Sequence, residues 1–373
     1  MIAFAVQQVF TGTEILETAT IRVDAGRIVS VDRGLQTGAT RLDGLLAPGL
    51  LDVQVNGGGG VLFNDAPSVD TLRTITIAHA KRGVTGLMAT LISDERGKAA
   101  AAIDAVGRGI REGIPGLAGL HLEGPWLSEP RRGVHPQRFL RSLDADDLKR
   151  LTADHDFPIM VTLAPEQASA DNVKELVQAG VRVCIGHTAA SHDAVEAFIA
   201  AGATGFTHLF NAMPPLEGRS PGPLGVALAN RQAWAGLILD GIHVHPVSAR
   251  AAFAAKGPEK LMLVSDAMAT VGAAHPSMDL FGQTVTVSNG ALRTEAGTLA
   301  GAHLDLGVAV RNAISMLGAT HEEALRMASL TPAQFLGIDS RRGRIAPGAR
   351  ADFILINNAL EVRKVWIGGE EVA

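Results

Sequence analysis

The chain has 373 residues, of which 47% are hydrophobic and 19% charged, and its formal net charge at pH 7 is −5. This length accommodates one large domain and a smaller one, and the composition is typical of a globular protein rather than a disordered one. No apolar run approaches the roughly 18 residues of a membrane helix, and the balanced charge provides no basic stripe for a phosphate backbone. We therefore expect a small-molecule ligand, with no membrane span and no nucleic-acid partner.

The cysteine content and the first residues indicate a reducing compartment. Cys184 has no second cysteine with which to form an internal disulfide. No basic residue precedes Arg22, and no small-residue cleavage site typical of a secretory signal follows the first apolar residues. We expect a cytoplasmic protein.

Both ends of the chain are rich in short β-type runs. Residues 1–47 contain such runs on either side of an Asp-Ala-Gly-Arg turn, and the runs 353–356 and 362–367 repeat the pattern near the other end. The two ends are therefore predicted to form one sheet together.

Between the ends, eight apolar runs of strand length alternate with longer segments of helical period. This alternation predicts repeated βα units in the α/β class, and eight such units predict a TIM-type barrel. Crossover helices are predicted over 191–201, 246–256 and 303–317, and an inserted β-hairpin over 278–299, which contains a Ser-Asn-Gly turn. The eight runs are residues 50–56, 84–91, 117–123, 158–166, 181–187, 203–208, 234–240 and 261–266.

Most of these runs end in a polar or ionisable residue. In a TIM-type barrel the carboxyl ends of the strands meet at one mouth, where catalytic groups lie. The alternative is that these residues cap the following helices, and for Asn56 and Asp266 the two interpretations are about equally good. Capping does not explain Glu123, His187 and His208, because neither residue type is a favoured cap.

Glu123, His187 and His208 form a candidate metal site. Each follows an apolar run at the predicted end of a separate strand. Two histidines and a glutamate that leave one position open for water are a known catalytic zinc set. Either histidine alone is more often a hydrogen-bonded structural residue, so the prediction depends on the three residues coming together.

Asp266, after the last run, is the predicted catalytic partner of this metal site. A bound metal lowers the pKa of water toward about 7, and a nearby carboxylate can accept its proton and return it to a leaving group. Such a pair would hydrolyse an amide or an ester. The alternative role for Asp266 is a helix N-cap.

Several long segments resemble the amidohydrolase superfamily and, within it, the N-acetylglucosamine-6-phosphate deacetylase family. The resemblance covers nearly the whole chain and implies a TIM-like (β/α)8 barrel over 48–342, with a small β-sandwich domain from 1–47 and 343–373. The segments that carry it are APGLLDVQVNGGGGVLFND (47–65), GLHLEGPWLSEPRRGVHP (119–136), IGHT (185–188), THLFNAMPPLEGRSPGPLG (207–225), DGIHVHP (240–246), LVSDAMATVG (263–272) and GRIAPGARADFILI (343–356).

The resemblance implies that Glu123, His187 and His208 bind the metal and that Asp266 is the general acid and base. Most of the superfamily has His-x-His where this chain has Gln54 and Asn56. Loss of those two imidazoles implies one divalent metal ion per subunit. Zinc fits the ligand set best, although iron, manganese or cobalt would also fit it.

The same resemblance implies a set of substrate-binding residues. An arginine with backbone N–H groups suits a phosphate dianion, because charge-assisted hydrogen bonds match its geometry. Without the resemblance, His135 and His243 would be interpreted as surface loop residues and Arg219 as a solvated charge. No role is predicted for Arg131, Arg132 or His245. The set is His135, Asn211, Ala212, Arg219, His243 and His303.

These expectations together predict deacetylation of N-acetylglucosamine 6-phosphate to glucosamine 6-phosphate and acetate, in amino-sugar catabolism and recycling. Members of the resembled family commonly form homodimers, which implies one here. One alternative is another amidohydrolase that acts on an N-acyl amino acid or a cyclic amide. A second is a catalytically silent homologue, which the presence of Glu123, His187, His208 and Asp266 argues against.

Overall fold

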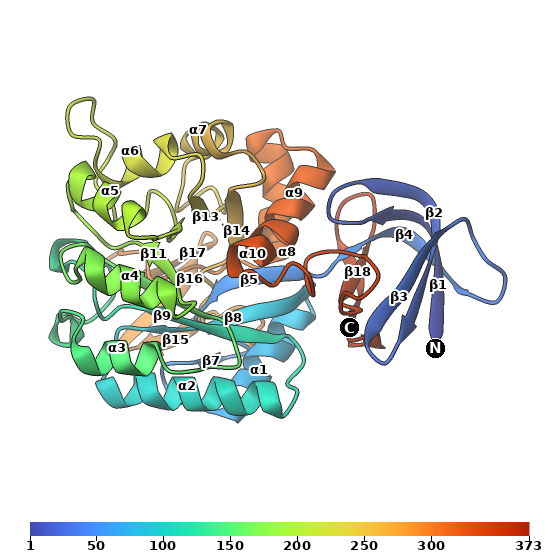
Figure 1. Cartoon of the computed structure of the whole chain (residues 1–373), viewed down its shortest axis with the longest axis horizontal. Coiled ribbons are helices and arrows are strands. Elements are labelled where there is room, and N and C mark those ends of the chain that lie inside the picture. Colours follow the sequence, from blue (N-terminus) through green and yellow to red (C-terminus); the bar gives the residue numbers. More distant parts are fainter. Residues whose placement is uncertain (373) are drawn as a thin grey trace.

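Eight parallel strands form the centre of the larger part of the molecule, and each of them overlaps one of the eight predicted runs (Figure 1). The computed structural model describes residues 1–372. The end of β5 lies beside the residues that follow β14. The Asp266 N–H donates to the Gln54 carbonyl at 3.0 Å, so the sheet nearly closes into the predicted barrel. In sheet order the strands are β14 (Leu261–Val264), β13 (Trp234–Ile238), β12 (Gly205–Phe206), β11 (Arg182–Ile185), β10 (Ile159–Leu163), β9 (Leu117–Glu123), β8 (Val84–Ile92) and β5 (Leu50–Val55).

Helices follow the strands and cover the outside of the barrel. Strands such as β8 and β9 are buried along their whole length, which explains their nearly continuous apolar sequence. None of the helices within residues 1–372 is long and apolar enough to cross a membrane. The helices are α1 (Val69–Ala80), α2 (Arg96–Arg111), α3 (Ala145–Leu151), α4 (Ala170–Gln178), α5 (His192–Ala200), α6 (Gly222–Ala229), α7 (Pro246–Lys256), α8 (Leu306–Asn312), α9 (His321–Met327) and α10 (Leu330–Leu336), with short helices η1 (Glu129–Arg131), η2 (Gln137–Phe139) and η3 (Ala313–Leu317).

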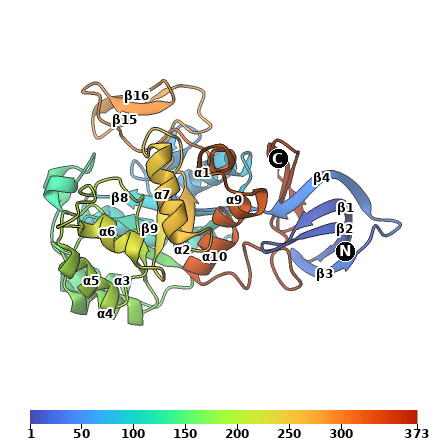
Figure 2. The same ribbon diagram turned by 90° about the horizontal axis from the view of Figure 1, so that it is seen from above.

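Strands from both ends of the chain form one seven-stranded sheet beside the barrel (Figure 2). β4 pairs with β18 in antiparallel register, which joins the two ends and confirms the predicted fold class. The rings of Phe4, Phe353 and Trp366 pack together in the core of this sheet. The boundaries after residues 47 and 342 remain our proposal for the domain division. The strands are β1 (Ile2–Phe10), β2 (Ile15–Asp24), β3 (Arg27–Arg33), β4 (Thr40–Pro48), β18 (Phe353–Ile356), β19 (Val362–Ile367) and β20 (Glu370–Glu371).

A three-stranded antiparallel sheet stands where the sequence predicts a hairpin over 278–299. It consists of β15 (Ser277–Leu280), β16 (Gln283–Ser288) and β17 (Ala291–Thr294). β16 and β17 turn through Asn289 and Gly290, whose φ angles of 49° and 78° are those of a tight hairpin turn. Its apolar face packs on Met268 and Ile92, which also line the mouth of the barrel. A further short pair, β6 (Gly57–Gly58) and β7 (Val61–Leu62), follows β5.

Candidate active site

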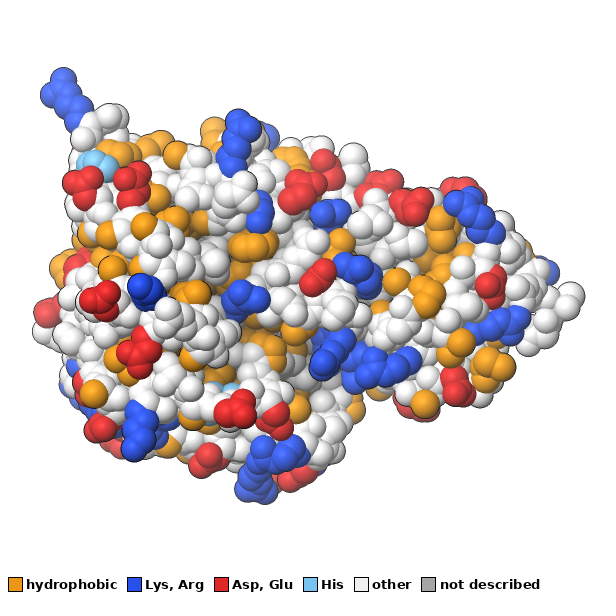
Figure 3. All heavy atoms as spheres, viewed as in Figure 1, with side chains coloured by type: hydrophobic (Ala, Val, Ile, Leu, Met, Phe, Trp, Pro, Cys, Tyr) orange, Lys and Arg blue, Asp and Glu red, His pale blue; other side chains and the backbone are white. Residues whose placement is uncertain are grey.

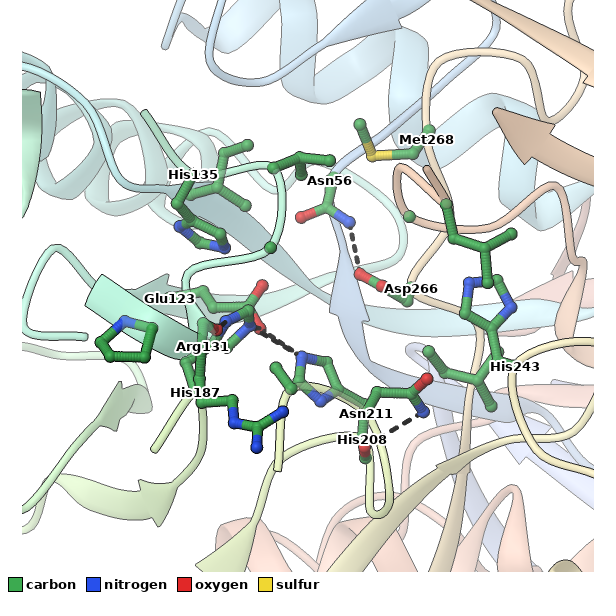
Figure 4. A pocket seen from close by; sticks show the side chains of 18 residues that line it. Asn56, Glu123, Arg131, His135, His187, His208, Asn211, His243, Asp266 and Met268 are labelled. Atoms are coloured by element: carbon green, nitrogen blue, oxygen red, sulfur yellow. Dashed lines mark hydrogen bonds and ion pairs between the residues drawn. The ribbon is translucent and has the colours of Figure 1, made fainter. Parts of the chain in front are cut away.

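A cavity of about 310 Å³ opens at the carboxyl ends of the barrel strands (Figure 4). Most of the residues predicted for the site line it, although they come from widely separated segments of the chain. The lining residues are Asn56, Ile92, Glu123, Pro130, Arg131, Gly133, Val134, His135, His187, His208, Asn211, Ala212, Ile238, His243, Asp266, Met268, Leu299 and Gly301.

Three of the key residues take up a backbone conformation that side chains usually avoid. The φ angles of His187, His208 and Asp266 are 49°, 27° and 50°, in the left-handed region. For a residue other than glycine this costs about 1–2 kcal/mol. Each residue directly or closely follows the end of its strand, and the sharp turn aims its side chain into the cavity. Backbone strain at these positions is typical of a functional site.

The side chains of Glu123, His187 and His208 converge on one point. Glu123 Oε1 lies 3.2 Å from His187 Nε2 and 3.0 Å from His208 Nε2, and the two nitrogens are 3.0 Å apart. Ligands about 2 Å from a common ion in tetrahedral geometry stand roughly 3.3 Å apart, so the three atoms fit a single divalent ion. His135 offers a ring nitrogen within 4.8 Å of the Glu123 and His187 ligand atoms, at the edge of the cluster.

The protonation of this cluster also fits a metal. His187 Nδ1 donates to the carbonyl of Arg131 at 2.8 Å, so in the neutral ring Nε2 keeps its lone pair for an ion. Burial would raise the pKa of Glu123, but the neighbouring imidazoles of His187 and His208 outweigh burial and hold this pKa well below the usual value. The carboxyl group is therefore an anion, as a metal ligand requires.

Gln54 and Asn56 hold the two carboxylates of the site in place. The Gln54 amide donates to Glu123 Oε1 at 3.1 Å and to Asp266 Oδ1 at 3.1 Å, and the Asn56 amide donates to Asp266 Oδ1 at 2.7 Å. Asn56 lines the cavity, whereas Gln54 is not among the lining residues. Both amides are neutral donors, so neither offers the imidazole nitrogen or carboxylate oxygen typical of a zinc ligand.

Asp266 has the ionisation behaviour expected of a general acid and base. Burial raises the pKa of its carboxyl to about 6, and the charge of Glu123 adds to the effect. A pKa between those of an ordinary carboxyl and of water at a metal allows one group both to accept and to return a proton near neutral pH.

His135 is set up as a neutral hydrogen-bond donor to the cavity. The backbone N–H of Ser93 donates to its Nδ1 at 3.2 Å, so the ring proton is on Nε2. Burial lowers the pKa of His135 to about 3. The neutral ring can therefore donate to an oxygen of a bound molecule.

His243, Asn211 and Ala212 line another part of the cavity wall. The His243 Nδ1 lies 2.6 Å from Asp240 Oδ2, and the two side chains are only 6% and 9% exposed. Asp240 also accepts from the backbone N–H groups of Ile242 and His243, each at 2.8 Å. Asp240 thus fixes the orientation of the His243 ring, a function that the sequence did not indicate beyond placing Asp240 at a strand end.

Two predicted substrate residues do not line this cavity. Arg219 is exposed, and the loop between β12 and α6 that carries it projects from the molecule (Figure 1). Basic side chains stand out singly on the face shown in Figure 3, and Arg219 is the sole Lys or Arg of segment 209–221. His303 is exposed too, and its Nδ1 lies 3.0 Å from Thr270 Oγ1. The predicted helix over 303–317 starts only at Leu306, after the N-cap Asp305.

The sequence pattern indicates no role for Arg131, although this residue lines the cavity. Nor did it identify a row of hydrogen bonds inside the barrel, one layer below the metal cluster. Thr90 Oγ1 lies 3.1 Å from His121 Nδ1, His121 Nε2 lies 2.8 Å from Thr162 Oγ1, and Thr162 Oγ1 lies 2.6 Å from Thr207 Oγ1. The polar residues within otherwise apolar runs were the available signal for this row.

A nearly closed barrel of eight parallel strands, with a carboxylate and two imidazoles converging at its mouth, defines a metal-dependent hydrolase. Residues 45–372 match the Amidohydrolase family. The chain belongs to that family, which is metal-dependent.

Relatives cover nearly the whole chain. It is 42% identical over 328 residues to an N-acetylgalactosamine-6-phosphate deacetylase of Shewanella sp. (strain ANA-3), spanning 88% of this chain and 83% of that protein. A crystal structure of N-acetylglucosamine-6-phosphate deacetylase from Pasteurella multocida superposes with a TM-score of 0.95 at 31% identity, covering 99% of both chains. An aspartate-to-alanine mutant of the Mycobacterium smegmatis deacetylase, in complex with N-acetyl-D-glucosamine 6-phosphate, gives 0.93 at 33% identity over 100% of this chain and 99% of that one.

Proposed function

We propose that this protein hydrolyses the acetamide of N-acetylglucosamine 6-phosphate, giving glucosamine 6-phosphate and acetate in amino-sugar catabolism. The observation that carries this proposal is the convergence of Glu123, His187 and His208 in one cavity with Asp266. The relatives named above supply the substrate class, and they share this architecture over nearly their whole length.

The residues of the cavity divide the reaction between them. A divalent ion held by Glu123, His187 and His208 would acidify the attacking water and polarise the acetamide carbonyl. Asp266 accepts the proton of that water and then donates it to the departing amine nitrogen. The Nε2–H of His135 donates to the carbonyl oxygen, on which negative charge develops during the attack. One carboxyl group thereby serves both halves of the hydrolysis.

We propose zinc as the ion, one per subunit, because two imidazoles and a carboxylate are typical zinc ligands. Iron, manganese or cobalt could occupy the same donors, since availability often decides between these metals. Metal analysis of the purified protein tests the stoichiometry: one equivalent supports the proposal, and two equivalents bound at the cavity would contradict the roles of Gln54 and Asn56.

The sugar phosphate is proposed to lie against His243 and the Asn211–Ala212 segment, which line the cavity. We further propose a cytoplasmic homodimer in which Arg219 of each subunit reaches the partner's cavity. The exposure of Arg219 on a projecting loop supports this arrangement, because the side chain is not among those that line its own cavity. Sedimentation of the metal-loaded protein and of Arg219→Ala tests the dimer separately from the kinetics.

The decisive experiment measures acetate release by the metal-loaded protein from N-acetylglucosamine 6-phosphate and from the unphosphorylated sugar. Release from the phosphorylated sugar with a strong preference over the unphosphorylated one is the expected result. No release from either, with metal bound, would reject the proposed substrate and favour an N-acyl amino acid or cyclic amide. A protein that binds metal but hydrolyses none of these amides would be a silent homologue.

A second candidate substrate is N-acetylgalactosamine 6-phosphate, which differs only in the configuration at carbon 4. The 42% identity to the Shewanella protein favours including it. The acetate assay therefore includes both epimers, and the ratio of their kcat/KM values identifies the preferred sugar. Equal values would indicate that the cavity does not distinguish the two configurations at carbon 4.

A further inference from the structure

Arg131 is the basic residue that lines the cavity. Of the 18 residues that line the cavity, it is the one lysine or arginine, as far as residues 1–372 are concerned. Figure 4 shows its side chain extending along the cavity wall beside His187. Arg219, the arginine predicted to bind phosphate, stands on the projecting loop instead.

The backbone at Arg131 is tied to the metal cluster. Its carbonyl accepts the hydrogen bond from His187 Nδ1 at 2.8 Å, and the Ser128 N–H donates to the His187 carbonyl at 2.9 Å. Arg131 also ends the short helix η1, in which its N–H donates to the Ser128 carbonyl at 3.0 Å. These three hydrogen bonds hold the Arg131 backbone, and with it the Cα from which the side chain extends, next to His187.

The guanidinium itself has no partner among the described residues. Within 1–372 it makes neither a hydrogen bond nor an ion pair, although the residue is half-buried. The two carboxylates of the cavity are engaged elsewhere, since Glu123 lies against both imidazoles and Asp266 accepts from Gln54 and Asn56. A half-buried arginine that lines a cavity without an anionic partner favours an anionic group on the ligand.

We propose that Arg131 binds the phosphoryl group of the substrate, from the same subunit that supplies Asp266. A planar guanidinium donates two parallel hydrogen bonds to phosphate, which suits a dianion better than a sugar hydroxyl. The other groups of this subunit near the proposed phosphate position are the Asn211 amide, the backbone at Ala212 and the His243 ring, so Arg131 adds the permanent charge. It thereby determines the preference for phosphorylated over neutral sugars. This inference rests on the proposed function.

The test compares Arg131→Gln and Arg131→Lys with the wild type on phosphorylated and unphosphorylated N-acetylglucosamine. Charge-assisted hydrogen bonds are strong, so Arg131→Gln should lower kcat/KM for the phosphorylated sugar about 10- to 100-fold, chiefly through KM. The value for the unphosphorylated sugar should stay within about 2-fold. Arg131→Lys should recover part of the loss, because it restores a charge without the two-pronged geometry.

Arg138→Gln is the matched control. Arg138 lies in the same loop, is exposed, does not line the cavity, and places its guanidinium 4.5 Å from the centre of the Phe139 ring. Its substitution should leave both sugars unaffected. An equal loss on both sugars in Arg131→Gln would overturn the proposal, because it would indicate that the residue only supports His187. No loss on either sugar would overturn it as well.

Binding of an unreactive sugar phosphate separates this proposal from the proposed function. Glucose 6-phosphate has the phosphoryl group but no acetamide, and glucose is its uncharged counterpart. Calorimetry on the metal-loaded protein should show glucose 6-phosphate binding that Arg131→Gln weakens at least 10-fold, with metal content unchanged. Equal binding by both proteins, or no binding by the wild type, overturns the Arg131 proposal. Failure of the acetate assay alone overturns the substrate and leaves this result standing.

Discussion

Asp266 is held in a strained backbone conformation by interactions that do not depend on its charge. Gln54 and Asn56 both donate to its Oδ1, and an asparagine at this position would accept the same two bonds through its own oxygen. Asp266→Asn should therefore keep the fold and the metal while kcat falls about 10²- to 10⁴-fold, because the group can no longer carry a proton. Steady-state kinetics with metal analysis on the same sample checks this. Turnover near the wild-type value would show that another group moves the proton.

At the residue scale, the positions of the residues at strand ends were easier to predict from the sequence than those of the loop residues proposed to bind substrate. Glu123, His187, His208 and Asp266 follow strand ends, so the barrel topology alone brings them to one mouth. Side chains on long loops have no such constraint, because their direction depends on the path of the loop. Arg219 and Arg131 both lie outside the barrel strands. The sequence around them does not indicate which of the two lines the cavity of its own subunit.

Four buried polar side chains on or next to neighbouring barrel strands form a row of hydrogen bonds. The apolar pattern of these strands does not predict it. His121 links Thr90 on β8 to Thr162 on β10, and Thr207, which directly precedes His208, extends the row. His121→Leu should reduce the free energy of unfolding by about 2–4 kcal/mol, since it leaves buried hydroxyls without partners. Metal affinity should fall about 10- to 100-fold, because Glu123 and His208 lose the layer that supports them.

Urea unfolding and a metal titration measure the two effects of His121→Leu. His155→Leu is the matched control: this half-buried histidine contacts the Arg150 carbonyl at the end of α3 and lies outside the barrel interior. It should leave metal affinity unchanged. Loss of stability without loss of metal affinity in His121→Leu would show that the row only fills the barrel.

At the element scale, the barrel strands were predictable because apolar runs of this length alternate regularly with helical segments. The β15 strand was not, since Ser277–Leu280 alternates weakly and is mostly exposed. The Asn289-Gly290 turn indicates only the pairing of β16 with β17. The sequence therefore predicts a two-stranded hairpin here. The helix at 303–317 was placed three residues early because the N-cap at Asp305 was not recognised.

The stability of the whole molecule should depend on pH through its buried histidines. His79 is a buried histidine that takes no part in the proposed reaction. Its Nε2 lies 2.9 Å from the Gly57 carbonyl, and burial lowers its pKa to about 4. The unfolded chain takes up this proton below about 6.5, whereas the folded protein does so only near 4. The contribution of His79 to the free energy of unfolding is therefore complete above pH 6.5. It is lost as the pH falls from 6.5 to about 4, by about 3 kcal/mol in total.

His79→Gln removes this proton uptake and keeps an amide able to donate to Gly57. Between pH 7.5 and pH 5, the wild type should lose about 2 kcal/mol more unfolding free energy than the variant. Urea unfolding at the two pH values checks the difference. His275→Gln, at an exposed position, should give a curve parallel to the wild type. A His79→Gln curve that is also parallel to the wild type would show that burial does not shift the pKa of this ring, because the folded and unfolded chains would then take up its proton together.

Metal removal tests whether the cluster at the mouth joins distant parts of the chain. Glu123, His187 and His208 come from β9 and from the segments after β11 and β12, so an ion held by all three binds only the folded chain. Free metal at about 1,000 times its Kd stabilises the fold by about 4 kcal/mol. Because the entropy of unfolding grows with chain length, this should correspond to roughly 5 °C in Tm on chelation. Calorimetry before and after chelation should show that shift and its reversal when metal is restored. His208→Asn should show little response, and an equal shift in this variant would place the stabilising ion outside the cluster.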